Sequence, residues 1–141
     1  MWRGAGILGG SVLERLKQKI GFAALAVMIL SVPFAMAADG DMTGEELTAL
    51  VGNGKKINLG GDGEGHSGSL DIKGDGTASW TVQVQGKTID DGGTWTINQN
   101  RFCRKWRTFD AGAEVCEVWR KIGDSRVVVL VDGKKIGLNW W

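Results

Sequence analysis

The chain has 141 residues, a formal net charge of +1, and seven tryptophans but no tyrosine. A chain of this length predicts a single domain. Its charge is unevenly spread, because residues 38–100 carry 4 basic and 10 acidic side chains and residues 101–141 carry 9 and 5. Domains that bind nucleic acid combine a basic face with a high net charge, so this distribution argues against a nucleic-acid partner.

Residues 1–37 have the pattern of a secretory signal peptide. Four basic residues precede the uncharged run IGFAALAVMILSVPF, which is followed by the small residues Ala35 and Ala37. A basic segment, an apolar stretch of about 7–15 residues and a small-x-small site define such a peptide. A membrane anchor would need about 20 apolar residues. We therefore predict cleavage after Ala37, a periplasmic or secreted mature chain of residues 38–141, and no membrane span after cleavage.

The first element predicted in the mature chain is a short helix in MTGEELTALVG, residues 42–52. Thr43 and Glu46 have the spacing of a capping box, which pairs two backbone N–H groups at a helix start. Leu47, Leu50 and Val51 share one face of this helix, and the glycine that follows is a typical stop signal.

The remainder of the chain predicts β-strands separated by turns. In TASWTVQVQ, apolar and polar residues alternate with the period of two that a strand requires. Asp75-Gly76, Asp91-Gly92-Gly93 and Asp132-Gly133 are typical hairpin turns. The predicted fold class is mainly β, with a short N-terminal helix and an antiparallel eight-stranded meander that closes into a small up-and-down, lipocalin-like barrel. The strands are expected at residues 55–60, 67–73, 77–85, 93–98, 101–108, 113–121, 126–131 and 134–140.

The two cysteines, Cys103 and Cys116, predict a structural disulfide. An even pair in a small exported domain is typically oxidised. If the fifth and sixth strands pair through a loop near 108–111, Cys103 lies opposite Cys116 and Lys105 lies opposite Glu114. The spacing of the cysteines matches neither C-x-x-C nor a familiar zinc pattern, so no metal and no cofactor are predicted.

Four tryptophans lie on successive predicted strands, on the side expected to face the core: Trp80, Trp95, Trp106 and Trp119. Such residues can line a pocket for a small apolar ligand, because a barrel of about eight strands can hold one. They can also fill the interior themselves, since a mature chain of this size has little room for a cavity. We expect the filled interior.

The glycine-rich stretch GGDGEGHSG, residues 60–68, is predicted to be a hairpin loop. Its candidate interaction residues are Asp62, Glu64, His66 and Ser67. The stretch lacks the ligand spacing of an EF-hand or of a stacked calcium repeat. His66 is the only histidine of the chain, so no second histidine can act as the base for Ser67. The stretch also lacks the lysine and the following helix of a phosphate-binding loop. No catalytic residue and no enzyme activity are therefore predicted.

A further contact surface is expected on the fifth predicted strand, which carries a run of basic residues: Arg101, Arg104, Lys105 and Arg107. Arginine is enriched in protein–protein hot spots, although a basic strand is also commonly a solvated face. Together with the loops 60–68 and 108–113, this run predicts a non-enzymatic interaction module whose partner is an envelope protein. The alternative is a barrel that binds a small apolar ligand.

A spaced pattern of G-x-W, C-x-x-W, a second cysteine and a G-D turn runs through the second half of the chain. Its residues are Gly93, Trp95, Cys103, Trp106, Cys116, Gly123 and Asp124. This pattern resembles a family of small exported bacterial β-barrel proteins of unknown function. The resemblance implies an envelope protein with a disulfide-stapled β fold, and it supplies no catalytic residues.

A second resemblance involves Ser67-Gly68. Periplasmic lysozyme inhibitors are small exported β-barrels that present a Ser-Gly loop to the acidic cleft of the enzyme, and the chain is similar to them at this dipeptide. The resemblance implies that Ser67 hydrogen-bonds to a catalytic carboxylate. The aromatic residue that normally follows is replaced here by Leu70 and Asp71.

Overall fold

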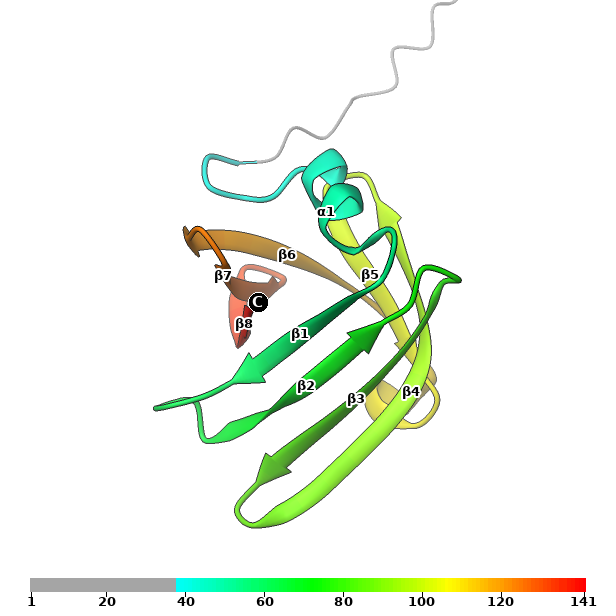
Figure 1. Ribbon diagram of the computed structural model, residues 1–141, viewed down its shortest axis with the longest axis vertical. Coiled ribbons are helices and arrows are strands. Elements are labelled where there is room, and N and C mark those ends of the chain that lie inside the picture. The colour runs from blue at the N-terminus through cyan, green and yellow to red at the C-terminus, as the bar shows by residue number, and fades with distance from the viewer. Residues whose placement is uncertain (1–37) are drawn as a thin grey trace, which may run out of the picture. The chain divides into compact units, whose positions relative to one another are not determined.

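The computed structural model describes residues 38–141, and the predicted signal peptide, residues 1–37, lies outside the described residues. The described chain forms one α-helix and eight antiparallel strands, which close into a barrel in sequence order (Figure 1). The predicted mainly β class, with a short helix and an antiparallel eight-stranded meander that closes into a barrel, is therefore confirmed. The elements are α1 (Gly44–Val51), β1 (Lys55–Gly60), β2 (His66–Ile72), β3 (Thr77–Val84), β4 (Lys87–Asn98), β5 (Arg101–Trp106), the 3-10 helix η2 (Phe109–Gly112), β6 (Glu114–Gly123), β7 (Arg126–Val131) and β8 (Lys134–Trp140).

The barrel closes where β1 meets β8, through the pairs Asn58↔Trp140 and Leu59↔Asn139. Closure pairs every strand on both sides and so removes exposed strand edges. In an up-and-down barrel, the connections that follow odd-numbered strands all lie at one end. We call this the loop end, and it comprises residues 61–65, 85–86, 107–113 and 132–133. The opposite end, which carries α1, is called the helix end (Figure 1).

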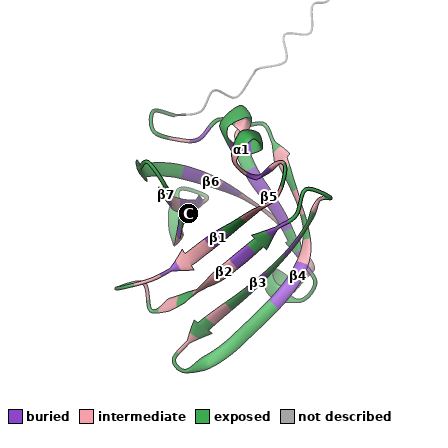
Figure 2. Ribbon diagram, viewed as in Figure 1, coloured by how far each residue is buried: buried purple, intermediate pink, exposed green. Residues whose placement is uncertain are grey.

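The third and fourth strands depart from the sequence prediction. β4 begins at Lys87, so the predicted turn Asp91-Gly92-Gly93 lies inside a strand and pairs with β3. The turn itself is Gln85-Gly86, where φ is 50° and 74°. Two consecutive positive φ values are what a two-residue hairpin turn needs. Residues 85–90 at this hairpin tip are exposed (Figure 2).

The helix α1 fills the helix end of the barrel. Thr43 and Glu46 form the predicted capping box, and the backbone N–H of Gly44 donates to Asn100 Oδ1 at 2.8 Å, which ties the helix to the β4–β5 turn. The buried side chains of α1 join one hydrophobic core with residues from five strands: Leu47, Val51, Ile57, Ile72, Phe102, Trp119 and Val127.

The predicted disulfide between Cys103 and Cys116 is confirmed. It joins β5 and β6 with an S–S distance of 2.06 Å. The strand register is also the predicted one, because Cys103 lies opposite Cys116 and Lys105 lies opposite Glu114. The disulfide therefore fixes the two strands that lead into and out of η2 at the loop end.

Candidate functional site

The loop end of the barrel interior contains a cavity with a volume of about 300 Å³. Two tryptophans and two phenylalanines form part of its wall: Trp80, Trp106, Phe102 and Phe109. The ring of Trp80 lies 6.2 Å from that of Trp106 and 5.3 Å from that of Phe109, measured between centroids, and both pairs meet edge to face. Aliphatic side chains complete most of the lining: Leu59, Leu70, Val82, Val84, Ile89, Val129, Ile136 and Leu138. A concave, mainly apolar lining of this kind suits an apolar ligand.

The four tryptophans predicted to face the core divide between the two ends. Trp80 and Trp106 are buried and line the cavity. Trp119 and Trp95 pack instead against Phe102, with ring centroids at 5.1 and 5.8 Å from its own. The expected filled interior is therefore correct for the helix end and wrong for the loop end.

Two features of the sequence keep the loop end from filling. The helix α1 is only 8 residues long, and its buried side chains belong to the core at the helix end. On β8, Gly137 lines the cavity without contributing a side chain, and a Cβ atom built there would meet no atom within 4 Å. A larger residue at this position would occupy part of the cavity.

Arg104 is the main charged group of the cavity, and its predicted place on the surface is wrong. On β5, Phe102, Arg104 and Trp106 all point inward, whereas Arg101 and Lys105 are exposed as expected. Arg104 is only 8% exposed. Its guanidinium carbon lies 5.6 Å from the centroid of the Trp106 ring, within the range of a cation–π interaction.

Two carboxylates neutralise the buried guanidinium. Arg104 Nε donates to Glu117 Oε1 at 2.5 Å, and Nη1 donates to Asp110 Oδ2 at 2.5 Å. Burial lowers the pKa of Arg104, but the charge of Glu117 and the hydrogen bonds to Asp110 and Glu117 outweigh it and raise the pKa above its ordinary value. The guanidinium therefore stays charged, and the group of three side chains has a formal charge of −1.

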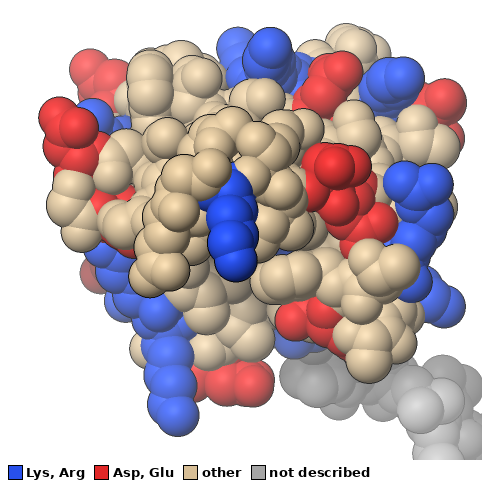
Figure 3. Space-filling view, turned by 90° about the horizontal axis from the view of Figure 1, so that it is seen from below, with Lys and Arg blue, Asp and Glu red and all other residues tan. Residues whose placement is uncertain are grey.

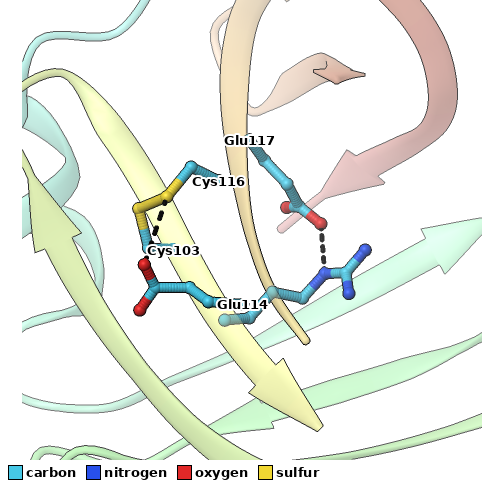
Figure 4. Close-up of a disulfide and its surroundings, with 5 residues drawn as sticks. Cys103, Glu114, Cys116 and Glu117 are labelled. Carbon is cyan, nitrogen blue, oxygen red and sulfur yellow. Dashed lines mark hydrogen bonds and ion pairs between the residues drawn. A yellow bond between two sulfur atoms is a disulfide. The ribbon is translucent and has the colours of Figure 1, made fainter. Parts of the chain in front are cut away.

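Glu117 projects from β6 on the side opposite to Cys116 (Figure 4). Its second carboxylate oxygen, Oε2, accepts a hydrogen bond from Trp119 Nε1 at 3.1 Å. Each oxygen of this buried carboxylate is thus paired with a different donor. Glu117 thereby connects the two ends of the barrel. It contacts Trp119 in the filled helix end and Arg104 at the cavity.

The turn η2 covers one side of the cavity, and Asp91 anchors it. Asp91 is buried, and its Oδ2 accepts hydrogen bonds from the backbone N–H groups of Phe109 (2.8 Å) and Thr108 (2.9 Å) and from Thr108 Oγ1 (2.9 Å). The hydrogen bonds from Phe109 and Thr108 hold the pKa of Asp91 well below its usual range. The sequence does not predict that Asp91 anchors η2, because Asp91 is followed by two glycines and Asp-Gly-Gly is typical of a turn.

The predicted interaction loop 60–68 is shorter than expected. The connection itself comprises residues 61–65, because Gly60 ends β1 and pairs with Ser67, the second residue of β2. Ser67 is exposed on a regular strand and does not lie at a loop tip. The lysozyme-inhibitor resemblance would need Ser67 at such a tip, so the structure adds no support for it.

The other candidate residues of this loop have separate surroundings. Asp62 is exposed. Glu64 accepts a hydrogen bond from Lys135 Nζ at 2.6 Å, which ties the loop to β8. His66 lines the cavity, and its Nδ1 lies 3.1 Å from the backbone oxygen of Glu64. Of the four candidates, His66 alone contributes to the cavity wall.

Exposed apolar side chains surround the cavity at the loop end. Ile89, Phe109 and Ile136 line the cavity and are 43%, 49% and 48% exposed. They make up three of the five large hydrophobic residues exposed within residues 38–141. Figure 3 views the molecule from this end. Most Lys, Arg, Asp and Glu side chains in this view lie around an area formed by residues other than these four types. The rim offers an apolar route into the cavity.

One group of side chains has the residue types of a metal site: Cys103, Glu114 and Cys116. The two sulfur atoms are joined in the disulfide, whereas a cysteine ligand must be a thiolate. This group is therefore not a metal site. Within residues 38–141 there is also no helix of the length and hydropathy needed to cross a membrane.

The fold and the cavity define a closed, eight-stranded, up-and-down β-barrel that is filled at one end and hollow at the other. Comparison of the chain with protein-family models, with curated proteins and with solved structures found no match. The resemblance to the small exported bacterial family remains a prediction from the sequence.

Proposed function

We propose that this protein is a non-enzymatic, exported binding protein that holds a small, mainly apolar ligand inside its barrel, in the manner of a lipocalin-like protein. The observation that carries the proposal is the cavity of about 300 Å³. This volume corresponds to roughly ten water molecules, at about 30 Å³ each. It also lies at the lower limit of ligand pockets, which span about 300–1,000 Å³.

The lining supports an apolar ligand. The wall consists mainly of aromatic and aliphatic side chains, and the apolar rim of Ile89, Phe109 and Ile136 leads into it. Export is supported by the signal-peptide pattern of residues 1–37 together with the disulfide, since structural disulfides persist mainly in oxidising compartments. A module that acts only through its loops would not need a hollow interior, so ligand binding is the better account.

The test is native mass spectrometry on protein isolated from the cell envelope, compared with a Gly137→Leu variant. Gly137 pairs with Val129, which is 3% exposed and lines the cavity, so a leucine at position 137 faces the interior, where its Cβ meets no atom within 4 Å. We expect the wild-type protein to carry the extra mass of a small molecule that disappears on denaturation, and the variant to lack it.

Both proteins are then titrated with the neutral apolar fluorophore N-phenyl-1-naphthylamine, which should bind only to the wild type. Absence of both signals from the wild type, or equal signals from the variant, would contradict the proposal.

A further inference from the structure

We infer that the ligand carries an uncharged hydrogen-bond acceptor, such as a ketone, ester or amide carbonyl, on its apolar body, and that Arg104 donates to this acceptor. The inference rests on the proposed function, because it specifies the ligand of the same cavity. It follows from the donor that the protein leaves unpaired at the cavity wall and from the charge already present there.

Arg104 supplies the donor. A guanidinium has five N–H groups, and the hydrogen bonds to Glu117 and Asp110 use Nε and Nη1. No acceptor among residues 38–141 takes a hydrogen bond from Nη2. Since Arg104 lines the cavity, Nη2 remains for a ligand. Its neighbours fix the side chain in place, so binding requires little loss of rotamer freedom.

Nη2 of Arg104 is also within reach of a ligand. The one buried side-chain nitrogen or oxygen without a hydrogen-bond partner in the described part of the chain is Trp80 Nε1, so the unpaired Nη2 is not shielded in this way. The guanidinium carbon of Arg104 lies 5.6 Å from the centroid of the Trp106 ring, which also lines the cavity. The donor therefore lies beside the apolar wall that would hold the body of the ligand.

The charge of the site favours an uncharged acceptor over a carboxylate. Glu117 and Asp110 already pair with Arg104, so the group is negative before a ligand enters. A carboxylate ligand would add a third negative charge to a partly buried site, where like charges repel more strongly than in water. A carbonyl accepts the same hydrogen bonds without this repulsion.

Three shape-matched probes test the inference: α-methylstyrene, acetophenone and benzoate. They place a C=CH2, a C=O or a carboxylate group on the same phenyl ring. Isothermal titration calorimetry gives a Kd for each, and the ratio of the α-methylstyrene Kd to the acetophenone Kd defines the carbonyl preference. Arg104→Lys keeps a positive charge but lacks Nη2. Trp95→Phe is the matched control, because Trp95 Nε1 donates to the backbone oxygen of Lys73 outside the cavity.

We expect the carbonyl preference to fall about tenfold in Arg104→Lys, and to stay unchanged in Trp95→Phe. In the wild-type protein, acetophenone should shift the NMR signals of the Arg104 guanidinium N–H groups more than α-methylstyrene does, which tests the inference without any variant. An unchanged preference in Arg104→Lys, or tighter binding of benzoate than of acetophenone, would overturn the inference. Failure of all three probes to bind the wild type would contradict the proposed function itself.

Discussion

Replacing Glu117 with glutamine tests the buried charged group that joins the two ends of the barrel. Glu117 is 6% exposed, and its two oxygens accept from Arg104 Nε and Trp119 Nε1. A glutamine side chain offers one acceptor oxygen and one NH2 group. Whichever way the amide turns, its NH2 group faces one of these two donors. Glu117→Gln therefore removes a charge and also leaves one buried donor unpaired.

The cost of Glu117→Gln follows from these two losses. A hydrogen bond to a charged group contributes about 1.5–3 kcal/mol, and an unsatisfied buried donor costs about 1–3 kcal/mol. Because Asp110 still pairs with Arg104, we expect a combined loss near the lower limit of these ranges, about 3 kcal/mol in the free energy of unfolding. Urea unfolding followed by tryptophan fluorescence measures this loss as a lower midpoint at an unchanged m value.

The double variant Arg104→Met/Glu117→Gln is the control for Glu117→Gln. Without the guanidinium, the glutamine oxygen can accept from Trp119 Nε1 while its NH2 group faces the cavity and not a second donor. Asp110, whose side chain is 33% exposed, can then be solvated. We expect the double variant to be more stable than Glu117→Gln, because no buried donor is left without an acceptor. A loss below about 1 kcal/mol for Glu117→Gln, or a double variant less stable than the single one, would refute the reasoning.

Three further perturbations test other parts of the fold. Replacing Cys103 and Cys116 with alanine removes a cross-link over a sequence separation of 13 residues and should cost about 3 kcal/mol through the entropy of the unfolded chain; equal urea midpoints would contradict this. The lowered pKa of Asp91 gives stability that is complete above its unfolded-state pKa of about 4 and is lost as the pH falls toward the folded-state pKa. Wild type should therefore lose more stability than Asp91→Asn between about pH 5 and pH 2, and parallel losses would exclude this role. Gly137→Leu should stabilise the protein by at least ~0.5 kcal/mol, because glycine weakens a strand interior, and a lower Tm would show that the cavity cannot take the side chain.

The strand order and the register of the disulfide could be predicted because they depend on local patterns. Alternation with period two marks the strands, and short glycine-containing turns leave consecutive strands only one simple way to pair. A loop near residues 108–111 then places Cys103 opposite Cys116, as observed. The failure at Asp91-Gly92-Gly93 has a local cause too, because the Gln85-Gly86 turn carries a weaker sequence signal than the Asp-Gly dipeptide.

The charged part of the site could not be predicted because its partners are distant in the chain. Arg104 has the same parity along β5 as Phe102 and Trp106, so alternation alone would have placed it inside the barrel. An isolated buried charge is highly unfavourable, and the basic neighbours of Arg104 therefore suggested a surface strand. Burial becomes acceptable only because Asp110 on η2 and Glu117 on β6 meet the guanidinium, and this requires the folded barrel. The cavity could not be predicted either, because it depends on how much of the interior α1 fills. The hydrophobic periodicity of the sequence does not indicate this.

The size of the cavity gives a final argument that the interior is built to be occupied. Its aliphatic and aromatic lining surrounds about 300 Å³ that no protein atom fills, so these side chains lack the dispersion contacts that a filled core would give them. Typical domains have a net stability of only about 5–15 kcal/mol, so the core at the helix end and the disulfide must supply the stabilisation that the loop end does not. A ligand that binds only the folded barrel should add to it, with about 2.7 kcal/mol of added stability at a free concentration of 100 times its Kd. We therefore expect acetophenone to raise the free energy of unfolding of the wild-type protein and not that of Gly137→Leu. Equal stabilisation of both proteins would place its binding outside the cavity.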